Sequence, residues 1–171
     1  IHCFGAPNTT LTATVSGGTP PFTYLWSGPA IQNGQGTLTI TTGSSGTYSI
    51  VVDDATNCPN ASANTNVTYL PQVTVNAGPN QFFCAPPNSI SLNGSVLNTN
   101  TYQWTTLGTG SFNPSSNMLN PSYIPSQNDI NNGSVQLVLN EVNSNGCSPV
   151  RDTLLISFFS IKLYFKIFLS E

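Results

Sequence analysis

Residues 16–28 read SGGTPPFTYLWSG, and this stretch decides the fold. Two glycines and two prolines mark a hard turn, because proline has no N–H to give to a sheet ladder. The five residues that follow read as a strand, in which residues two apart share a face. Phe22, Tyr24 and Trp26 therefore lie on one side. We predict that Trp26 anchors a hydrophobic core, with Tyr24 beside it.

The same motif returns later in the chain. Residues 101–104 read Thr-Tyr-Gln-Trp, so Trp104 and Tyr102 are expected to be the equivalent core anchors of a second module. The order of cysteine, strand, Thr-Tyr-x-Trp, Gly-led strand and cysteine repeats after about eighty residues, which indicates tandem modules. We expect modules at 1–70 and 71–159, followed by an apolar tail at 160–171.

Short alternating runs separated by turn residues fill both modules. Runs of about five residues between Gly, Pro and Asn clusters are typical of all-β sandwiches. The sequence therefore predicts an all-β protein made of two tandem immunoglobulin-like β-sandwiches. The expected strands are 11–15, 22–26, 37–41, 47–52, 66–70, 72–77, 89–96, 101–106, 134–142 and 152–158.

Charged residues are scarce, and this limits the classes of function that the chain can have. Only 5% of the 171 residues are charged, and no Lys or Arg precedes Arg151. Nucleic-acid binding needs cationic groups, so this class is excluded, and an anionic membrane surface is a poor partner for the same reason. The one histidine is His2, and the six acidic residues are scattered, so no catalytic residues are assigned and the chain is not expected to be an enzyme.

Four cysteines indicate disulfides rather than a metal site. Cys3, Cys58, Cys84 and Cys147 form no CxxC pair, and a single histidine cannot complete a zinc site at such spacing. An even number of cysteines in a β-rich chain points to two disulfides in an oxidising compartment. The spacing favours pairing within each module, Cys3 with Cys58 and Cys84 with Cys147.

No cofactor is expected, and calcium is the one metal with a candidate site. Asp53, Asp54 and Asn57 fall in a single turn and all offer oxygen ligands. No spaced DxDxD run is present, so a solvated turn with Asx hydrogen bonds is the favoured interpretation.

The first module resembles the SprB-type repeat of flavobacterial (Bacteroidetes) cell-surface adhesins. The matching residues are Cys3, SGGTPPFTYLWS (16–27) and SGTYSIVVDDATNC (45–58). The second module looks like the PKD-like, immunoglobulin-like domains found beside such repeats, through NAGPNQFFC (76–84), ISLNGSV (90–96), 123–139 and 145–157. The resemblance implies secreted or cell-surface, non-catalytic sandwiches in tandem arrays. Family members carry a strand before the first cysteine, whereas here only Ile1 and His2 precede it, so the first module is expected to lack its opening strand.

The tail has the pattern of a surplus strand. Alternate apolar residues form one face, and Lys162 and Lys166 argue against a membrane span. We expect an extracellular adhesin or filament subunit whose tail completes the first module of another copy by β-strand addition. The alternative is a carbohydrate-binding module that uses exposed Tyr and Trp to hold surface glycans. The expected assembly residues are Ile161, Leu163, Phe165, Ile167 and Leu169.

Overall fold

A computed structural model describes residues 1–56 and 59–159. The chain divides into two compact units, unit 1 from Ile1 to Gln72 and unit 2 from Val73 onward, two residues beyond the boundary expected from the sequence. Each unit has its own hydrophobic core. Both units are sandwiches of mainly antiparallel sheets, and the expected fold class is confirmed.

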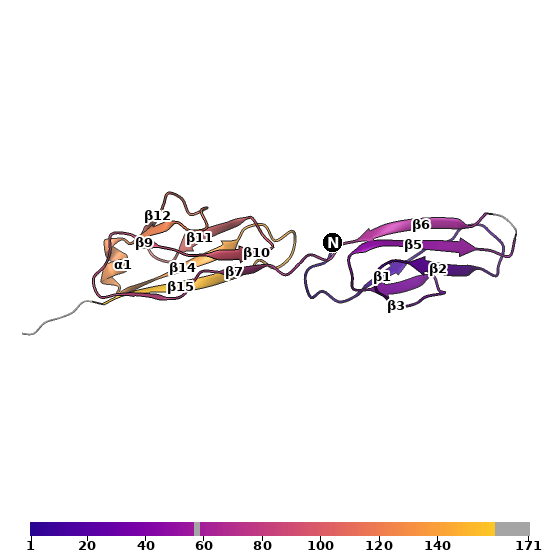
Figure 1. The fold of residues 1–171 in the computed structure, drawn as a ribbon, viewed down its shortest axis with the longest axis horizontal. Helices are drawn as coiled ribbons and strands as arrows, with labels where there is room; N and C mark the ends of the chain where they lie inside the picture. The colour runs from indigo at the N-terminus through magenta and orange to yellow at the C-terminus, as the bar shows by residue number, and fades with distance from the viewer. Residues whose placement is uncertain (57–58, 160–171) are drawn as a thin grey trace, which may run out of the picture. The chain divides into compact units, whose positions relative to one another are not determined.

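Unit 1 packs two three-stranded sheets face to face. One sheet has the order β1-β4-β3 and the other β2-β5-β6, and Figure 1 shows β5 between β6 and β2. Trp26, Tyr48 and Ile50 fill the space between the sheets. The strands are β1 (Thr9–Thr12), β2 (Thr23–Ser27), β3 (Ile31–Asn33), β4 (Thr39–Thr42), β5 (Gly46–Asp53) and β6 (Ala61–Val67).

Unit 2 repeats this plan with additional strands at its start. Its larger sheet has the order β11-β14-β15-β8, in which β8 runs parallel to β15, and two smaller ones are ordered β12-β13-β9 and β10-β7. Figure 1 shows β14 between β11 and β15. The elements are β7 (Thr74–Asn76), β8 (Gln81–Phe83), β9 (Ile90–Ser91), β10 (Ser95–Leu97), β11 (Tyr102–Thr106), β12 (Ser111–Asn113), β13 (Ser122–Ile124), α1 (Gln127–Asn131), β14 (Ser134–Glu141) and β15 (Arg151–Phe158).

The core anchors lie where the aromatic motif predicts. Trp26 is 5% exposed and Trp104 is 1% exposed, and each indole N–H donates to a backbone carbonyl, that of Thr37 at 2.9 Å and that of Leu119 at 3.0 Å. Tyr24 and Tyr102 pack at the margins of the two cores. A buried indole needs a partner for its N–H, and the backbone supplies one in both units.

The short helix α1 is set by its cap. Ser126 accepts from the Asp129 N–H, while the Asp129 carboxylate accepts from the Ser126 N–H, so two free donors of the first turn are satisfied. Asp129 is 2% exposed and also accepts from the Tyr123 hydroxyl and the Thr109 N–H. A single carboxylate therefore ties α1 to β13 and to the turn before β12.

Candidate functional site: an open groove in unit 1

A groove of about 470 Å³ opens between the edges of the two sheets of unit 1. One wall is the chain that continues β1, residues 12–16, and the other is the outer edge of β6. Its floor is the core itself, formed by Trp26, Tyr48, Ile50 and Val52. No lining residue is charged. The site is therefore an uncharged cleft that leads directly to a hydrophobic core.

The strand register shows that core-facing positions of β6 are left uncovered. Ala61 pairs with Val52 and Ala63 with Ile50, so these two alanines lie on the same side of the sheet as buried core residues. Thr65 follows on the same face. All three are exposed, although their neighbours on β5 are buried. Small side chains with nothing above them create the hollow.

The edge of β6 carries one backbone contact on its open side. His2 forms an isolated parallel bridge with Tyr69: its N–H donates to the Thr68 carbonyl at 2.7 Å, and the Leu70 N–H donates to the His2 carbonyl at 2.8 Å. The His2 and Tyr69 rings stack with centroids 4.8 Å apart. The described residues place no strand beside Ala61–Val67 on that side. The open edge has the unpaired backbone groups that a further strand would use.

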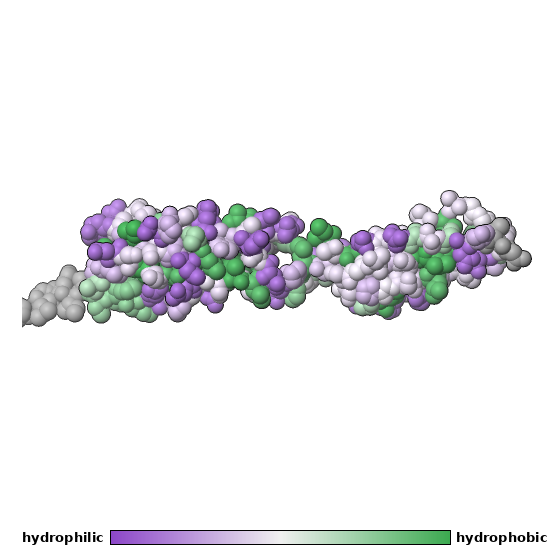
Figure 2. All heavy atoms as spheres, turned by 45° about the horizontal axis from the view of Figure 1, so that its top comes forward, coloured by the Kyte–Doolittle hydropathy of each residue, from purple (hydrophilic) through white to green (hydrophobic). Residues whose placement is uncertain are grey.

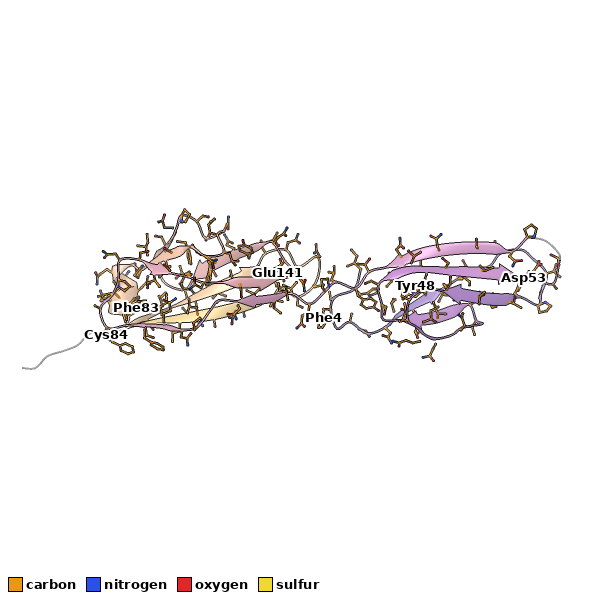
Figure 3. The ribbon with its side chains drawn as sticks, viewed as in Figure 1. Phe4, Tyr48, Asp53, Phe83, Cys84 and Glu141 are labelled. Carbon is orange, nitrogen blue, oxygen red and sulfur yellow. The ribbon has the colours of Figure 1, made fainter. Side chains whose placement is uncertain are left out.

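The floor of the groove is held in position by hydrogen bonds. Gln35 accepts from the Trp26 N–H at 2.9 Å and donates to the Trp26 carbonyl at 2.7 Å, as a strand neighbour would. The Tyr48 hydroxyl contacts Thr42 and the carbonyls of Pro29 and Ser44. Figure 3 shows Tyr48 directed into the sandwich. The side chains on the floor of the groove are therefore held in place by hydrogen bonds.

Asp53 and Asp54 of the turn proposed for calcium line a smaller hollow that shares Val15, Ser16, Val52 and Ala61 with the groove. The Asp54 carboxylate accepts from the Thr19 N–H at 2.9 Å and from the N–H and hydroxyl of Thr56. The Thr56 hydroxyl, followed by the backbone N–H groups of Thr19 and Thr56, lowers the pKa of Asp54. Asp54 thus joins the Gly-Gly-Thr-Pro-Pro turn to the end of β5. Asn57 lies outside the described residues, in which no group of three His, Cys, Asp or Glu side chains is arranged to hold a metal.

The cysteines require a correction. Cys147 is disulfide-bonded, whereas Cys84 is free and exposed, so the Cys84–Cys147 pairing is wrong. Cys84 follows Phe83, which lies opposite Phe158 at the end of β15, and Cys147 precedes the start of β15. Eight strand residues span about 25 Å, far more than a disulfide bridges. In Figure 3, Cys84 and Glu141 lie well apart along unit 2.

The Cys3–Cys58 pairing is not supported either. Cys3 follows the His2–Tyr69 bridge, beyond the end of β6 that pairs with Gly46. The chain toward Cys58 leaves from Asp53, at the other end of β5, and Figure 3 shows Phe4 and Asp53 at opposite ends of unit 1. Cys58 itself lies outside the described residues. Cysteine spacing carries no information about which end of a strand each residue reaches, and this is why the Cys84–Cys147 pairing failed.

The remaining hydrophobic surface is scattered except at the end of β15. Phe82 is 64% and Phe159 53% exposed, and their rings stack with centroids 6.3 Å apart. Figure 2 shows hydrophobic residues interspersed with hydrophilic ones on the visible face of both units. The expected assembly residues, Ile161 to Leu169, lie outside the described part of the chain. Within 1–56 and 59–159, no helix has the length and hydrophobicity that crossing a membrane requires.

Sequence reasoning missed the wall of the groove. We expected a strand at 66–70, whereas β6 runs from Ala61 to Val67. The segment ASANTNV is polar, and its inward positions are Ala and Thr rather than large apolar residues, so its alternation was not visible. The sequence did contain a signal for this strand, because a small residue stands at every second position. Such a pattern indicates a strand whose core-facing side leaves space for side chains from elsewhere.

Comparisons with known proteins agree with the fold and with part of the resemblance. The family model of the SprB repeat matches residues 1–30, and the resemblance of the second module to PKD-like domains finds no such support. A comparison with curated proteins finds no match. The chain is therefore similar to a SprB repeat over its first 30 residues.

Solved structures with a similar fold are cadherin and immunoglobulin domains. Extracellular cadherin domains 3–6 of protocadherin gamma B2 align with a TM-score of 0.52 at 14% identity, over 92% of this chain and 43% of that chain. Human protocadherin-24 EC1-2 aligns at 0.40 and 14% identity over 83% of each chain. Immunoglobulin domains 1–5 of Sidekick-1 align at 0.36 and 14% identity, over 90% and 38%. The chain spans less than half of the first of these.

Proposed function

We propose that this chain is an extracellular, adhesion-type structural subunit that assembles by β-strand addition. The single observation that carries the proposal is the open groove of unit 1, where Ala61, Ala63 and Thr65 face the core position yet remain exposed. In strand addition, an extended segment of another chain pairs with a free sheet edge, and its alternate side chains fill the pockets. A groove without charges suits an apolar strand.

An extracellular location agrees with the disulfide chemistry. Cys3 and Cys147 are oxidised, and structural disulfides persist in secreted and surface proteins. The SprB-repeat match at residues 1–30 and the cadherin-like fold point in the same direction. Structural rather than catalytic work fits a chain in which Asp54 and Asp129 serve as turn and cap residues.

The donor in this proposal is the C-terminal tail. Its apolar face contains Ile161, Leu163, Phe165, Ile167 and Leu169, and its other face contains Lys162, Tyr164 and Lys166. Contact between a tail and a groove joins unlike surfaces, so it propagates head to tail into a filament instead of closing a dimer. Within residues 1–56 and 59–159 each unit already has its own hydrophobic core, so we expect both units to fold without the tail.

The carbohydrate-binding alternative has less support. Its premise was exposed Tyr and Trp, but Trp26 and Trp104 are buried, and Tyr24 and Tyr102 pack against the cores. A sugar platform needs an exposed aromatic ring next to polar side chains. The exposed pair Phe82 and Phe159 has no hydrogen-bonding group of its own.

Deletion of residues 160–171 tests the proposed function. The full chain should form oligomers that grow with protein concentration in sedimentation velocity and appear as filaments in electron microscopy, whereas the deleted chain should stay monomeric. Phe165→Lys should abolish assembly, and the matched control Tyr164→Lys, on the other face of the expected strand, should preserve it. Filaments from the deleted chain, or a monomeric full chain at high concentration, would contradict strand addition by the tail.

A further inference from the structure

The structure assigns the groove of unit 1 a direction: we infer that it accepts a strand parallel to β6, supplied by the tail of a second copy. This inference rests on the proposed function and adds to it the acceptor site and the polarity of the incoming chain. It follows from the one bridge already present on the open edge and from the equivalent edge in unit 2.

The bridge fixes the polarity of the open edge. His2 pairs with Tyr69 in the parallel sense and takes both hydrogen bonds that this position offers, to the Thr68 carbonyl and from the Leu70 N–H. A strand that lies beside Ala61–Val67 and continues the sense of this one-residue ladder is parallel to β6, as β8 is to β15 in unit 2. Its carboxyl end therefore points toward His2, and its amino end lies beside Ala61.

Unit 2 shows what such a strand does when it is present. β8 runs parallel to β15, with Gln81 opposite Ile156 and Phe83 opposite Phe158. Phe83 points into the core, whereas Phe82, on the other face, is exposed. Before β8, β7 pairs with β10, so one N-terminal segment covers both sheet edges of unit 2. The groove of unit 1 is the place where this segment has no counterpart among residues 1–56 and 59–72.

The shape of the groove selects large alternating apolar side chains. The acceptor strand contributes Ala61, Ala63 and Thr65, and the opposite wall contributes Ala13 and Val15, all small or medium in size. The space left by small side chains must be filled by large ones if the core is to reach normal packing density. A donor with Ile, Leu or Phe at every second position meets this requirement.

The sequence of the tail has this pattern. Ile161, Leu163, Phe165, Ile167 and Leu169 alternate, so they would face the groove while Lys162 and Lys166 face solvent. In unit 2, β8 already pairs in parallel with Ile156–Phe158, the last three residues of β15. The donor in this inference is therefore the tail of a second copy.

Two variants on adjacent residues test the acceptor. Ala63→Lys places a long charged side chain in the groove, and Asn64→Lys places the same side chain on the outer face of the same strand. Ala63→Lys should reduce tail-dependent oligomerisation at least tenfold in apparent affinity, while Asn64→Lys leaves it within about twofold. Loss of assembly on tail deletion, together with full assembly of Ala63→Lys, would overturn the groove as acceptor without overturning strand addition.

A labelled tail tests the polarity and the identity of the donor. A synthetic peptide of residues 160–170, with a nitroxide at its carboxyl end, is added to the chain that lacks 160–171, and the amide signals of β6 are followed by NMR. The parallel arrangement predicts selective broadening at Val67 and Tyr69, and a nitroxide at the amino end should broaden Ala61. The reverse pattern would overturn the polarity. Absence of binding, or a full chain that closes its own groove as a monomer, would overturn the second copy as donor.

Discussion

The strands β6 and β15 occupy equivalent places beside the central strands β5 and β14, but their outer sides differ. On β15, the core-facing residues Leu154, Ile156 and Phe158 are buried, whereas on β6 the corresponding face, Ala61 to Thr65, is exposed. Both strands pair in antiparallel fashion with the central strand of their sheet. The difference lies on the outer side: β8 pairs with the end of β15, whereas the only bridge described on the corresponding side of unit 1 joins His2 to Tyr69, beyond the end of β6.

This difference shows that the N-terminal strand of a unit, as well as its core residues, decides whether the inner faces of the two sheets are shielded from solvent. In unit 2, the segment containing β7 and β8 crosses from one sheet to the other, and the Ala77 N–H donates to the Asp152 carboxylate on β15 at 2.8 Å. In unit 1, the gap is lined by small, uncharged side chains. An exposed sheet edge is a site for pairing with another strand, as the proposed assembly requires.

The largest expected effect comes from removal of a core anchor. Trp104→Ala should lower the free energy of unfolding of unit 2 by about 3–5 kcal/mol, because the cavity is enclosed on all sides. Trp26→Ala should cost less, since its cavity opens into the groove and water enters. Chemical denaturation followed by circular dichroism measures both. Each unit contains one tryptophan, so the fluorescence of the remaining one reports the other unit. A larger loss of unfolding free energy for Trp26→Ala than for Trp104→Ala would contradict the view that the core of unit 1 is open and that of unit 2 is closed.

The next effect compares the two edges directly. Ile156→Ala on the covered strand should destabilise unit 2 by about 2–5 kcal/mol. Thr65→Ala on the open strand should change the stability of unit 1 by less than about 0.5 kcal/mol, as exposed positions do. Urea unfolding followed by Trp104 fluorescence for the first variant and by Trp26 fluorescence for the second provides the test. A cost above 1 kcal/mol for Thr65→Ala would mean that the inner face of β6 is already packed in the monomer.

A smaller effect than that of the core truncations is expected at Asp129, the most buried carboxylate of unit 2. Burial opposes the ionisation of Asp129, but hydrogen bonds from the N–H groups of Thr109 and Ser126 and from Tyr123 outweigh it and lower its pKa. Because the folded pKa lies below the unfolded value of about 3.9, Asp129 stabilises unit 2 fully above that pH, and the contribution is lost as the pH falls through the folded pKa. Asp129→Asn should cost about 1–3 kcal/mol at neutral pH.

The dependence of stability on acid pH distinguishes the contribution of Asp129 from those of the other carboxylates. The native chain should lose stability in unit 2 below about pH 4, and Asp129→Asn should flatten that part of the profile. Unit 1 has no carboxylate buried to this degree among its described residues, so Trp26 fluorescence should report a weaker acid dependence. At the alkaline end, burial first and then Asp129 raise the pKa of Tyr123 to about 12, so stability should fall as the pH rises above about 10. An acid profile unchanged by Asp129→Asn would show that other groups control it.

The sequence predicted the anchors well because they depend on local rules. The turn at 16–21 and the alternation through Trp26 are short-range features, and the repeat of Thr-Tyr-x-Trp placed Trp104 correctly. The strands β3, β8, β12 and β13 were not expected, since each has only three residues and lacks a clear alternation. Short strands of this kind depend on pairing with distant neighbours.

The sequence by itself determined the all-β class, the two modules, the buried tryptophans and the scarcity of charged residues. These properties follow from composition and from a two-residue period, which are local. Only the tertiary structure decided which cysteines can meet, where β6 begins, and that the inner face of β6 stands open while that of β15 is covered. Those properties depend on which strand ends lie together and on what covers an edge, and both are set by contacts between residues far apart in the chain.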